Sequence, residues 1–460
     1  MHRIPRRRFG RLVGGGALLA LGGGYSAARG GAQSETPAGA GGNWAHTFDY
    51  TPRAFHEASS VEELQEIVGR AGRVKALGSR HSFSQAANTD GTLVSLKKLN
   101  QILDVDKEKR QVTVQAGITY GQLCPELHRH GLAVPNLASL PHISVAGAGA
   151  TATHGSGIGN GNLATSIAGL KLVTAEGKLL TATRESHPEE FAGMPVNLGA
   201  LGVVVEVTLD LVPQFQAQQF VYLDLPFSSL RGDGFQAVMS SGYSTSLFIE
   251  DWSSRRVNEV WIKHKVDGAP RKAESDFYGA RPADRHVHPI LRLDATSCTP
   301  QLGEVHPSYD ILPHFKFGFT PSVGDELQAE FFVPLKDAPA ALEAMAGIGD
   351  LIKPVLLVSE IRVVKNDDLW LSMAYGDAPW VGVHSTLKKD VVGVMKVLPE
   401  IERTLAPFGA RFHWAKLTTM DKKAVEARYP KLPQFRRLAA KLDPSRKFEN
   451  DYLRRLVLPT

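Results

Sequence analysis

The sequence predicts an α+β fold made of two domains and a short C-terminal segment. In residues 43–214, short apolar strands are interspersed with helical patterns, which is typical of an α+β domain. Residues 215–429 contain longer strands that alternate with helices. This change of pattern predicts a second domain with a large antiparallel sheet covered by helices on one face. Residues 430–460 complete the chain with a helix and an extended tail, and the sequence shows no internal repeat.

The elements of the first domain follow from the spacing of its apolar residues. Val61, Leu64, Ile67 and Val68 recur at helical spacing, and Gly131 ends a second helical pattern. Alternating and Val-rich runs predict strands, two of which flank a tight turn. The expected elements are helices over 61–71 and 120–130, strands over 74–77, 93–96, 112–115 and 201–212, and a hairpin of 170–174 and 178–182.

The elements of the second domain are longer. Apolar runs bounded by polar residues predict its strands, and amphipathic stretches between them predict its helices. The expected strands cover 220–225, 328–333, 355–364 and 380–387, and the expected helices cover 338–346 and 389–405.

The N-terminus carries the excess of positive charge. Residues 1–32 hold six arginines and no acidic residue, and without these six the formal charge falls from +5 to about −1. The near-neutral remainder gives no electrostatic reason to expect a nucleic acid partner. Arginines at positions 6 to 8 precede a short glycine-rich apolar run, an arrangement typical of twin-arginine export signals. We therefore expect residues 1–42 to be a signal and linker.

An export signal implies where the protein works. We expect the twin-arginine translocase to export it, and a soluble monomer in the periplasm or outside the cell. No other segment approaches roughly 18 consecutive apolar residues. Cys124 and Cys298 are the only cysteines, which is too few for a disulfide framework or a metal site. Buried free thiols are the favoured interpretation, and a single disulfide stays an open alternative.

Three stretches rich in glycine, serine and other small residues carry the densest chemical signal. They cover residues 78–83, 135–147 and 151–161. Glycine and serine at this density let a backbone approach an anion closely and point N–H groups at it, which suits a dinucleotide pyrophosphate. None of the three has the G-x-G-x-x-G spacing that opens a Rossmann helix. Taken alone, such stretches are more often turns than phosphate sites.

These stretches resemble the FAD-binding domain of the vanillyl-alcohol-oxidase, or PCMH-type, flavoenzymes, and within that group the alditol oxidases. The string Asn-Leu-Ala-Ser-Leu-Pro-His-Ile-Ser-Val-Ala-Gly at 136–147 and the string Thr-His-Gly-Ser-Gly at 153–157 carry the resemblance most specifically. The similarity runs from about Trp44 to the C-terminus. Near the end, Asp443-Pro444 and Lys447-Phe448-Glu449-Asn450 resemble the signature where the chain of these oxidases returns to the flavin domain. Leu312-Pro313-His314-Phe315 also matches, and the resemblance gives it no chemistry.

The resemblance implies that His81, within G-x-x-H-S, holds FAD through one covalent bond to the 8α-methyl carbon of the flavin. Relatives with a second bond use a cysteine where this sequence has Ala138-Ser139-Leu140. Arg80 stands where the wider family commonly has glycine, which puts the local backbone in question. No metal is expected. The residues expected at the FAD are Ala76, Leu77, Gly78, Ser79, Arg80, His81, Ser82, Ser139, Ser144, Gly147, Thr151, Ala152, Thr153, His154 and Val203.

Polar side chains interrupt three apolar stretches of the second domain. Glu360 and Arg362 are two residues apart in one expected strand, so they point to the same side. His384 and Thr386 repeat this spacing in the next strand, and Lys416 follows in an aromatic stretch. Without the resemblance, this pattern fits a chain of ion pairs between strands as well as it fits a site.

The resemblance to alditol oxidases favours a site. It implies oxidation of the terminal C1 hydroxyl of a polyol, such as xylitol or sorbitol, to the aldose, with O2 reduced to H2O2. Arg362 and Lys416 would stabilise negative charge on the substrate oxygen and the reduced flavin, and His384 would accept the hydroxyl proton. The residues that match the polyol-binding set are Ser139, Glu360, Arg362, Thr386 and Lys416.

Two alternatives share the expected fold. A dehydrogenase would pass electrons to a quinone or cytochrome instead of O2, and an aldonolactone oxidase has the same motif around His81. Ala138 stands where a small residue admits oxygen in this family, and an alanine there does not decide the acceptor. A flavin-storage or sugar-binding protein without enzymatic activity is the interpretation that the sequence supports least.

Overall fold

The computed structural model describes residues 39–319 and 326–459, and the chain from Thr36 onward belongs to one compact unit. The expected export signal lies outside the described residues except for its last four positions. Among the described helices, none combines the length and apolar character that crossing a bilayer requires.

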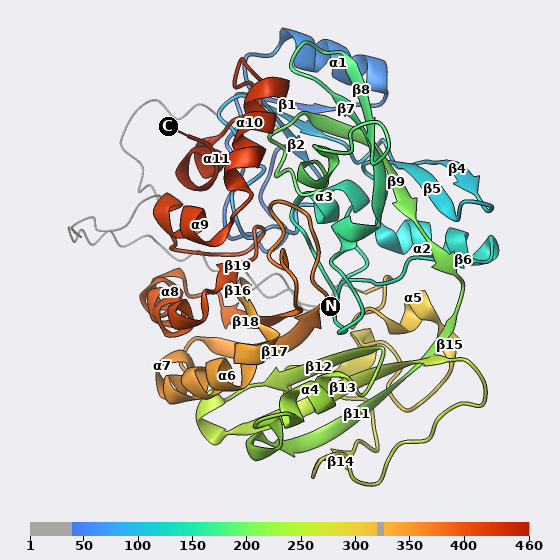
Figure 1. Ribbon diagram of the computed structural model, residues 1–460, viewed down its shortest axis with the longest axis vertical. Helices are drawn as coiled ribbons and strands as arrows, with labels where there is room; N and C mark the ends of the chain where they lie inside the picture. Colours follow the sequence, from blue (N-terminus) through green and yellow to red (C-terminus); the bar gives the residue numbers. More distant parts are fainter. Residues whose placement is uncertain (1–38, 320–325, 460) are drawn as a thin grey trace, which may run out of the picture. The chain divides into compact units, whose positions relative to one another are not determined.

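Two larger sheets and one two-stranded sheet make up the N-terminal part of this unit (Figure 1). Its elements are β1 (Ala54–Glu57), α1 (Val61–Arg70), β2 (Val74–Leu77), β3 (Thr92–Ser95), β4 (Ile102–Asp106), β5 (Gln111–Gln115), α2 (Tyr120–Arg129), β6 (Leu132–Ala133), α3 (Val145–Ala150), β7 (Ile167–Val173), β8 (Leu179–Thr183), β9 (Val203–Asp210) and β10 (Val212–Pro213). One sheet is parallel, with the order β1-β3-β2, and the other is antiparallel, with the order β4-β5-β9-β7-β8. Helix α1 lies between β1 and β2 in the chain, and Ser60 caps it by accepting a hydrogen bond from the N–H of Glu63.

The following part is built on one large sheet. Its strands are β11 (Gln216–Pro226), β12 (Ser244–Ile249), β13 (Arg256–Val266), β14 (Arg281–Pro282), β15 (His306–Pro307), β16 (Glu326–Pro334), β17 (Leu356–Val364), β18 (Trp380–Lys388) and β19 (Arg411–Phe412). The described strands pair antiparallel throughout, in the order β14-β11-β13-β12-β17-β18-β16-β19, with β15 also on β11.

Helices cover one face of this sheet. They are α4 (Gly234–Met239), α6 (Ala338–Gly347), α7 (Gly349–Ile352) and α8 (Val391–Leu405). Helix α5 (Ser308–Ile311) is separate from them and contacts β11, β15 and α2. Helices α6 and α8 contact each other and β16, and α4 contacts β12. The fully buried Phe331, Ile361 and Val383 alternate along their strands with the polar residues of the opposite face. The expected α+β class, with a large antiparallel sheet covered by helices, is confirmed.

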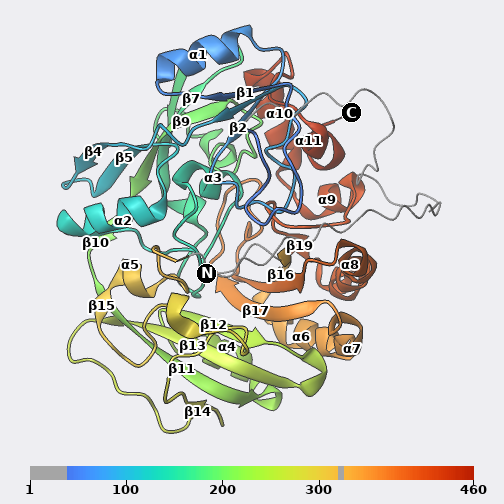
Figure 2. The same cartoon turned by 180° about the vertical axis from the view of Figure 1, so that it is seen from behind.

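The C-terminal segment packs on the first sheet. Helices α9 (Lys422–Arg428), α10 (Leu432–Leu442) and α11 (Asp451–Leu456) complete the fold, and Figures 1 and 2 both show α10 and α11 beside β1 and β2. The N–H of Val74 donates to the carbonyl of Lys447 at 2.9 Å, and the side-chain amide of Asn450 donates to the carbonyl of Asn88 at 2.7 Å. The expected division of the chain at residues 214 and 215 stays a prediction.

The expected helices and strands agree with the structure to within a few residues at each end, but the extended tail expected at the C-terminus contains a second helix, α11. The hairpin is β7 and β8, and the Val-rich strand is β9. The sequence analysis did not name β4, β12 or β13, although β12 and β13 hold the centre of the large sheet. Cys124 and Cys298 are both buried free thiols, as favoured.

Lys75 ties three parts of the fold together. Its side chain is 2% exposed, and its ammonium group donates to the carbonyls of Leu198 and Gly199, both at 3.0 Å, and of Phe448 at 3.3 Å. A lysine with three N–H groups satisfies three buried acceptors, which a shorter or apolar side chain cannot do.

We predict that Lys75→Met lowers the free energy of unfolding by about 2–3 kcal/mol, because three buried carbonyls lose their donor while the cost of burying the charge disappears. Urea denaturation followed by tryptophan fluorescence measures this. The matched control is Lys178→Met on the exposed turn before β8, which should leave the midpoint nearly unchanged. Equal effects of the two substitutions would contradict the prediction.

Candidate active site

Strand register places the polar residues of the large sheet in one row. Phe248 of β12, Glu360 of β17, His384 of β18 and Glu330 of β16 are direct neighbours across four adjacent strands. Side chains of directly paired residues lie on the same face, so this row follows from the register. Glu330 is fully buried, and Glu360 and His384 are each 6% exposed. The sheet therefore brings two carboxylates and a histidine to one wall.

Arg362 lies beside this row, two residues after Glu360 in β17 and on the same face of the sheet. Its Nη2 donates to Glu330 Oε1 at 2.7 Å, and its Nε lies 3.6 Å from Glu360 Oε1. Its partner on β18 is Gly382, where a Cβ would stand 3.0 Å from Glu330 Oε1. The glycine leaves room for the arginine to reach across β18 to the carboxylate.

The pKa values in this wall follow from burial and from these ion pairs. Burial alone would raise the pKa of Glu330, but Arg362, with His154 and His384, holds it well below its usual range. The pKa of Glu360 is likewise held below its usual range, because Arg362 and His314 outweigh the effect of burial. Burial lowers the pKa of His384, so the ring is neutral near neutral pH and can accept a proton.

Lys416 reaches the site along the edge of the sheet. After β19 the chain follows β16: the N–H of His413 donates to the carbonyl of Glu330 at 3.0 Å, and the N–H of Leu417 donates to that of Gln328 at 2.9 Å. The ammonium group of Lys416 donates to Gln328 Oε1. Burial lowers the pKa of Lys416 to about 8, and the Glu330 carboxylate opposes this shift. Lys416 is therefore a cation at neutral pH, close to losing its proton.

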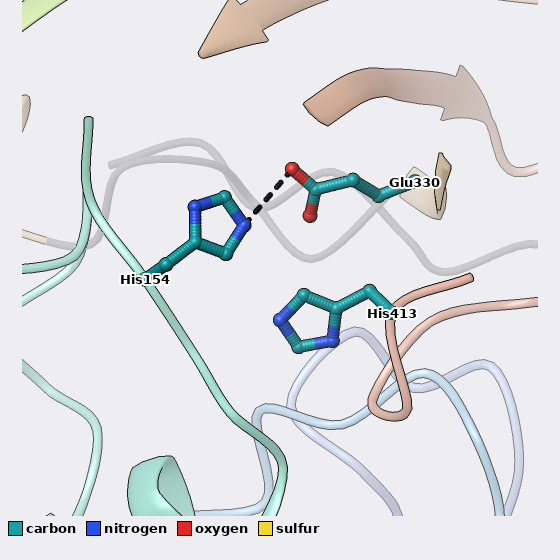
Figure 3. Close-up of side chains that lie close together, drawn as sticks. All are labelled: His154, Glu330 and His413. Carbon is teal, nitrogen blue, oxygen red and sulfur yellow. Dashed lines mark ion pairs between the residues drawn. The ribbon is translucent and has the colours of Figure 1, made fainter. Parts of the chain in front are cut away.

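His154, Glu330 and His413 form a buried cluster whose possible ligand atoms lie within 4.8 Å of one another (Figure 3). The hydrogen bonds argue against a metal centre. Ala415 N–H donates to His413 Nδ1 at 3.0 Å, so a neutral His413 ring carries its proton on Nε2 and cannot ligate through that atom. Oε1 of Glu330 already forms an ion pair with Arg362. His154 Nδ1–H donates to the carbonyl of Gly155 at 2.8 Å, which leaves Nε2 facing Glu330 Oε1 at 3.2 Å.

The glycine- and serine-rich stretches form the opposite wall of the same cavity. Gly155 shows how closely their backbones pack, since a Cβ there would stand 2.2 Å from the carbonyl oxygen of Leu137. Ser79 Oγ accepts a hydrogen bond from the N–H of Ser144 at 3.0 Å, which joins the first stretch to the second. This arrangement of exposed backbone and small side chains beside an apolar floor fits an FAD.

His81 lies between the two walls. Its ring stacks on Trp44 with the centroids 5.2 Å apart. No described residue hydrogen-bonds to the nitrogens of the His81 ring. Burial, with the charges of His142 and Lys416, lowers the pKa of His81 to about 3. The ring is therefore neutral, with a nitrogen lone pair available for a bond.

Arg80 fixes the segment that precedes Trp44. Its backbone is left-handed, with φ of 65°, a conformation that favours glycine. Its guanidinium donates to the carbonyls of Gly39 at 3.1 Å and Gly42 at 3.3 Å, and also to that of Ala40. The N–H of Trp44 donates to the Arg80 carbonyl at 2.9 Å. The arginine thus clamps residues 39–44 over the histidine.

A cavity of about 300 Å³ collects almost all of the expected site residues. Two do not line it. Ala152 is fully buried in a turn with φ of 52°. Gly202 and Val204 line the cavity instead of Val203, because alternate strand residues face opposite sides. The expected residues that do line it are Ala76, Leu77, Gly78, Ser79, Arg80, His81, Ser82, Ser139, Ser144, Gly147, Thr151, Thr153, His154, Glu360, Arg362, His384, Thr386 and Lys416.

The sequence analysis missed several residues of this cavity. Glu330 lies two positions after Gln328 in β16, so period-2 alternation would have placed both on one face. His413 stands three residues before Lys416. His314 belongs to the matched stretch without assigned chemistry, and its Nε2 donates to Glu360 Oε1 at 2.7 Å.

Comparisons with known proteins agree with this geometry. Residues 52–183 match the family described as an FAD binding domain, and residues 324–456 match the family described as D-arabinono-1,4-lactone oxidase. The chain is 42% identical to an alditol oxidase of a Streptomyces strain, over 90% of this chain and 98% of that protein. The chain belongs to this family of FAD-dependent oxidoreductases.

More distant relatives differ in their named substrates. The chain is 30% identical to the L-gulonolactone oxidase of Mus musculus, over 90% of this chain and 97% of that one. It is 28% identical to an L-gulono-1,4-lactone dehydrogenase of Mycobacterium tuberculosis, over 91% and 99%. The crystal structure of cholesterol oxidase from B. sterolicum has the same fold, with a TM-score of 0.71 at 16% identity over 91% of this chain and 96% of that one.

We predict that Arg80→Gly loosens the segment 39–44 and lowers the fraction of protein that acquires flavin by about threefold or more. The substitution removes the guanidinium that holds three carbonyls while keeping a residue that tolerates positive φ. The ratio of flavin absorbance to protein absorbance measures the effect.

The matched control is Arg110→Gly, which also replaces an arginine at positive φ, in the turn before β5. This variant should keep the wild-type ratio. Full flavin content in Arg80→Gly would contradict a clamping role.

Proposed function

We propose that the protein oxidises the terminal C1 hydroxyl of a polyol such as xylitol or sorbitol to the aldose, with O2 reduced to H2O2. The observation that carries this proposal is one cavity in which Glu360, Arg362, Thr386 and Lys416 of the sheet wall lie with His81 and with Ser139 of the glycine-rich wall. Several fixed charges and hydroxyls along one wall suit a flexible chain that carries a hydroxyl on every carbon. The identity to an alditol oxidase supports the same substrate class.

We also propose that the FAD is attached covalently through His81. The neutral ring and its nitrogens without hydrogen-bond partners among the described residues support one bond to the flavin. No cysteine lies beside Ala138 and Ser139, so a second bond is not expected.

The FAD, when bound, supplies the acceptor for a hydride from the carbinol carbon and returns the electrons to O2. His384 accepts the hydroxyl proton: its Nδ1 lies 3.4 Å from Glu330 Oε2, and its Nε2 lies 3.2 Å from Thr386 Oγ1. Arg362 and Lys416 place positive charge where the substrate oxygen becomes negative. Glu360 and Thr386 hold the neighbouring hydroxyls and orient the carbon chain.

Export through the twin-arginine translocase to the periplasm or beyond, and a monomeric state, remain part of this proposal. The five arginines that precede a short apolar run near the N-terminus support the export route.

The dehydrogenase relative keeps a second function open, in which a quinone or cytochrome replaces O2 as the acceptor. Purified protein should release H2O2 under air when xylitol or sorbitol is added, and its yellow colour should stay with the acid-precipitated pellet. Bleaching by a polyol under argon without peroxide formation under air would favour the dehydrogenase. If aldonolactones bleach the flavin and polyols do not, the substrate assignment is wrong.

We predict that Lys416→Met lowers the rate of flavin reduction by polyol about 100-fold or more, because a cation beside the reacting oxygen is lost. Flavin content should not change. In the wild type the rate should fall as pH rises through about 8, since Lys416 then loses its proton, and the variant should lack this alkaline limb. Anaerobic stopped-flow absorbance between pH 6 and 10 measures both effects.

Lys423→Met, an exposed lysine in α9, is the matched control and should behave like the wild type. Near-normal reduction rates in Lys416→Met would remove this lysine from the mechanism.

A further inference from the structure

His314 lines the cavity beside Glu360, and the proposed mechanism gives it no role. Its side chain is 5% exposed and packs edge-on against the rings of Phe248, at 5.5 Å, and Trp261, at 5.2 Å. Its backbone N–H donates to the carbonyl of Ser139 at 3.1 Å. One residue therefore touches two members of the expected polyol-binding set, Glu360 through its ring and Ser139 through its backbone.

A buried lysine takes part in the hydrogen bonds through this ring. Lys263 is 1% exposed, and its Nζ contacts the carbonyls of Leu312 at 2.5 Å and Pro313 at 3.0 Å, and His314 Nδ1 at 2.9 Å. Three acceptors match the three N–H groups of an ammonium. Burial lowers the pKa of Lys263 to about 7. Because the Glu360 carboxylate can only accept, Nε2 of His314 carries the proton and Nδ1 accepts from Lys263. Burial lowers the pKa of His314 to about 4, which keeps the ring neutral with this single proton.

The proton on Nε2 points at Glu360. The distance from Nε2 to Glu360 Oε1 is 2.7 Å, which is typical of a hydrogen bond to a charged acceptor. Arg362 approaches the same oxygen, at 3.6 Å. Glu360 Oε2 has no hydrogen-bond partner among the described residues, while the residue lines the cavity. The carboxylate is thus anchored by one oxygen and presents the other.

We propose that His314, oriented by Lys263, is a positioning residue that determines polyol specificity by fixing the Glu360 carboxylate toward the substrate hydroxyls. This inference rests on the proposed function and deepens it. The hydrogen bond from Lys263 to His314 and the one from His314 to Glu360 keep Glu360 a hydrogen-bond acceptor. The site therefore selects substrates that carry hydroxyl donors beyond the reacting carbon. Without the ring, the carboxylate turns toward Arg362 and loses its orientation.

The first test separates binding from chemistry. His314→Leu should raise KM for xylitol about 10- to 100-fold, the range expected for a lost charge-assisted hydrogen bond, and should change kcat less than about threefold. His314→Gln should restore KM to within about threefold, because its amide can accept from Lys263 and donate to Glu360. His264→Leu, which replaces the next residue after Lys263 and does not line the cavity, should resemble the wild type.

A double-mutant cycle tests whether His314 acts through Glu360. In a Glu360→Gln background, His314→Leu should produce less than about a twofold further change in the substrate dependence of anaerobic flavin reduction. A separate structural role would give the full change in both backgrounds, and this result would overturn the inference. Equal KM values in His314→Leu and the wild type would also overturn it.

Folding and the proposed function are monitored independently. Thermal melting and bound-flavin absorbance report on each variant, and if His314→Leu fails to hold flavin, Lys263→Met takes its place in the same cycle with the same expected KM increase. If polyols do not bleach the wild-type flavin at all, the proposed function fails. If they bleach it and the cycle is additive, only the role of His314 fails.

Discussion

The ion pair between Glu330 and Arg362 is the interaction on which both walls of the site depend. Glu330 is fully buried and Arg362 is 6% exposed, so each charge has lost most of its hydration. A buried ion pair offsets that loss only when its geometry is good and further hydrogen bonds satisfy its remaining atoms. Here the Arg362–Glu330 distance is 2.7 Å, and Nη1 of Arg362 also lies 3.4 Å from Ser139 Oγ and 3.5 Å from the carbonyl of His154. The arginine therefore connects the large sheet to the glycine-rich stretches.

Charges of opposite sign alternate along this wall. Glu330 pairs with Arg362, Arg362 lies beside Glu360, and Glu360 accepts from His314, behind which stands Lys263. Each member lowers the cost of burying the next, which is why both carboxylates stay ionised in a nearly dry environment. A wall that is already oriented needs little rearrangement when a polar substrate arrives, and such preorganisation is the main source of electrostatic catalysis.

The sequence predicted the part of the site that depends on local periodicity. Glu360 and Arg362 share a face because strand residues alternate, and this holds whatever the neighbouring strands do. Glu330 is different, because its place in the site depends on the register that pairs it with His384. A shift of this register by one residue would turn the Glu330 side chain to the helix-covered face. The contact of His314 with Glu360 joins residues 46 positions apart, which no local pattern encodes. The conformation of Arg80 likewise depended on backbone packing. The expectation for Val203 was wrong for a different reason, because strand alternation turns its two neighbours toward the cavity.

The two walls tolerate change to different degrees. The glycine-rich wall is formed by backbone, and a side chain at Gly155 would collide with the Leu137 carbonyl, which cannot rotate away. The sheet wall is formed by side chains on a register that stays the same when they are exchanged. Exchanges there must keep the alternation of charges, because one unpaired charge at this depth would cost several kcal/mol. Relatives that match over 90% of this chain bear the names of alditol oxidase and L-gulonolactone oxidase, so one fold serves named substrates of different kinds. In this chain, a single substitution of Glu330 or Arg362 would break their ion pair before it could create a new contact with a substrate.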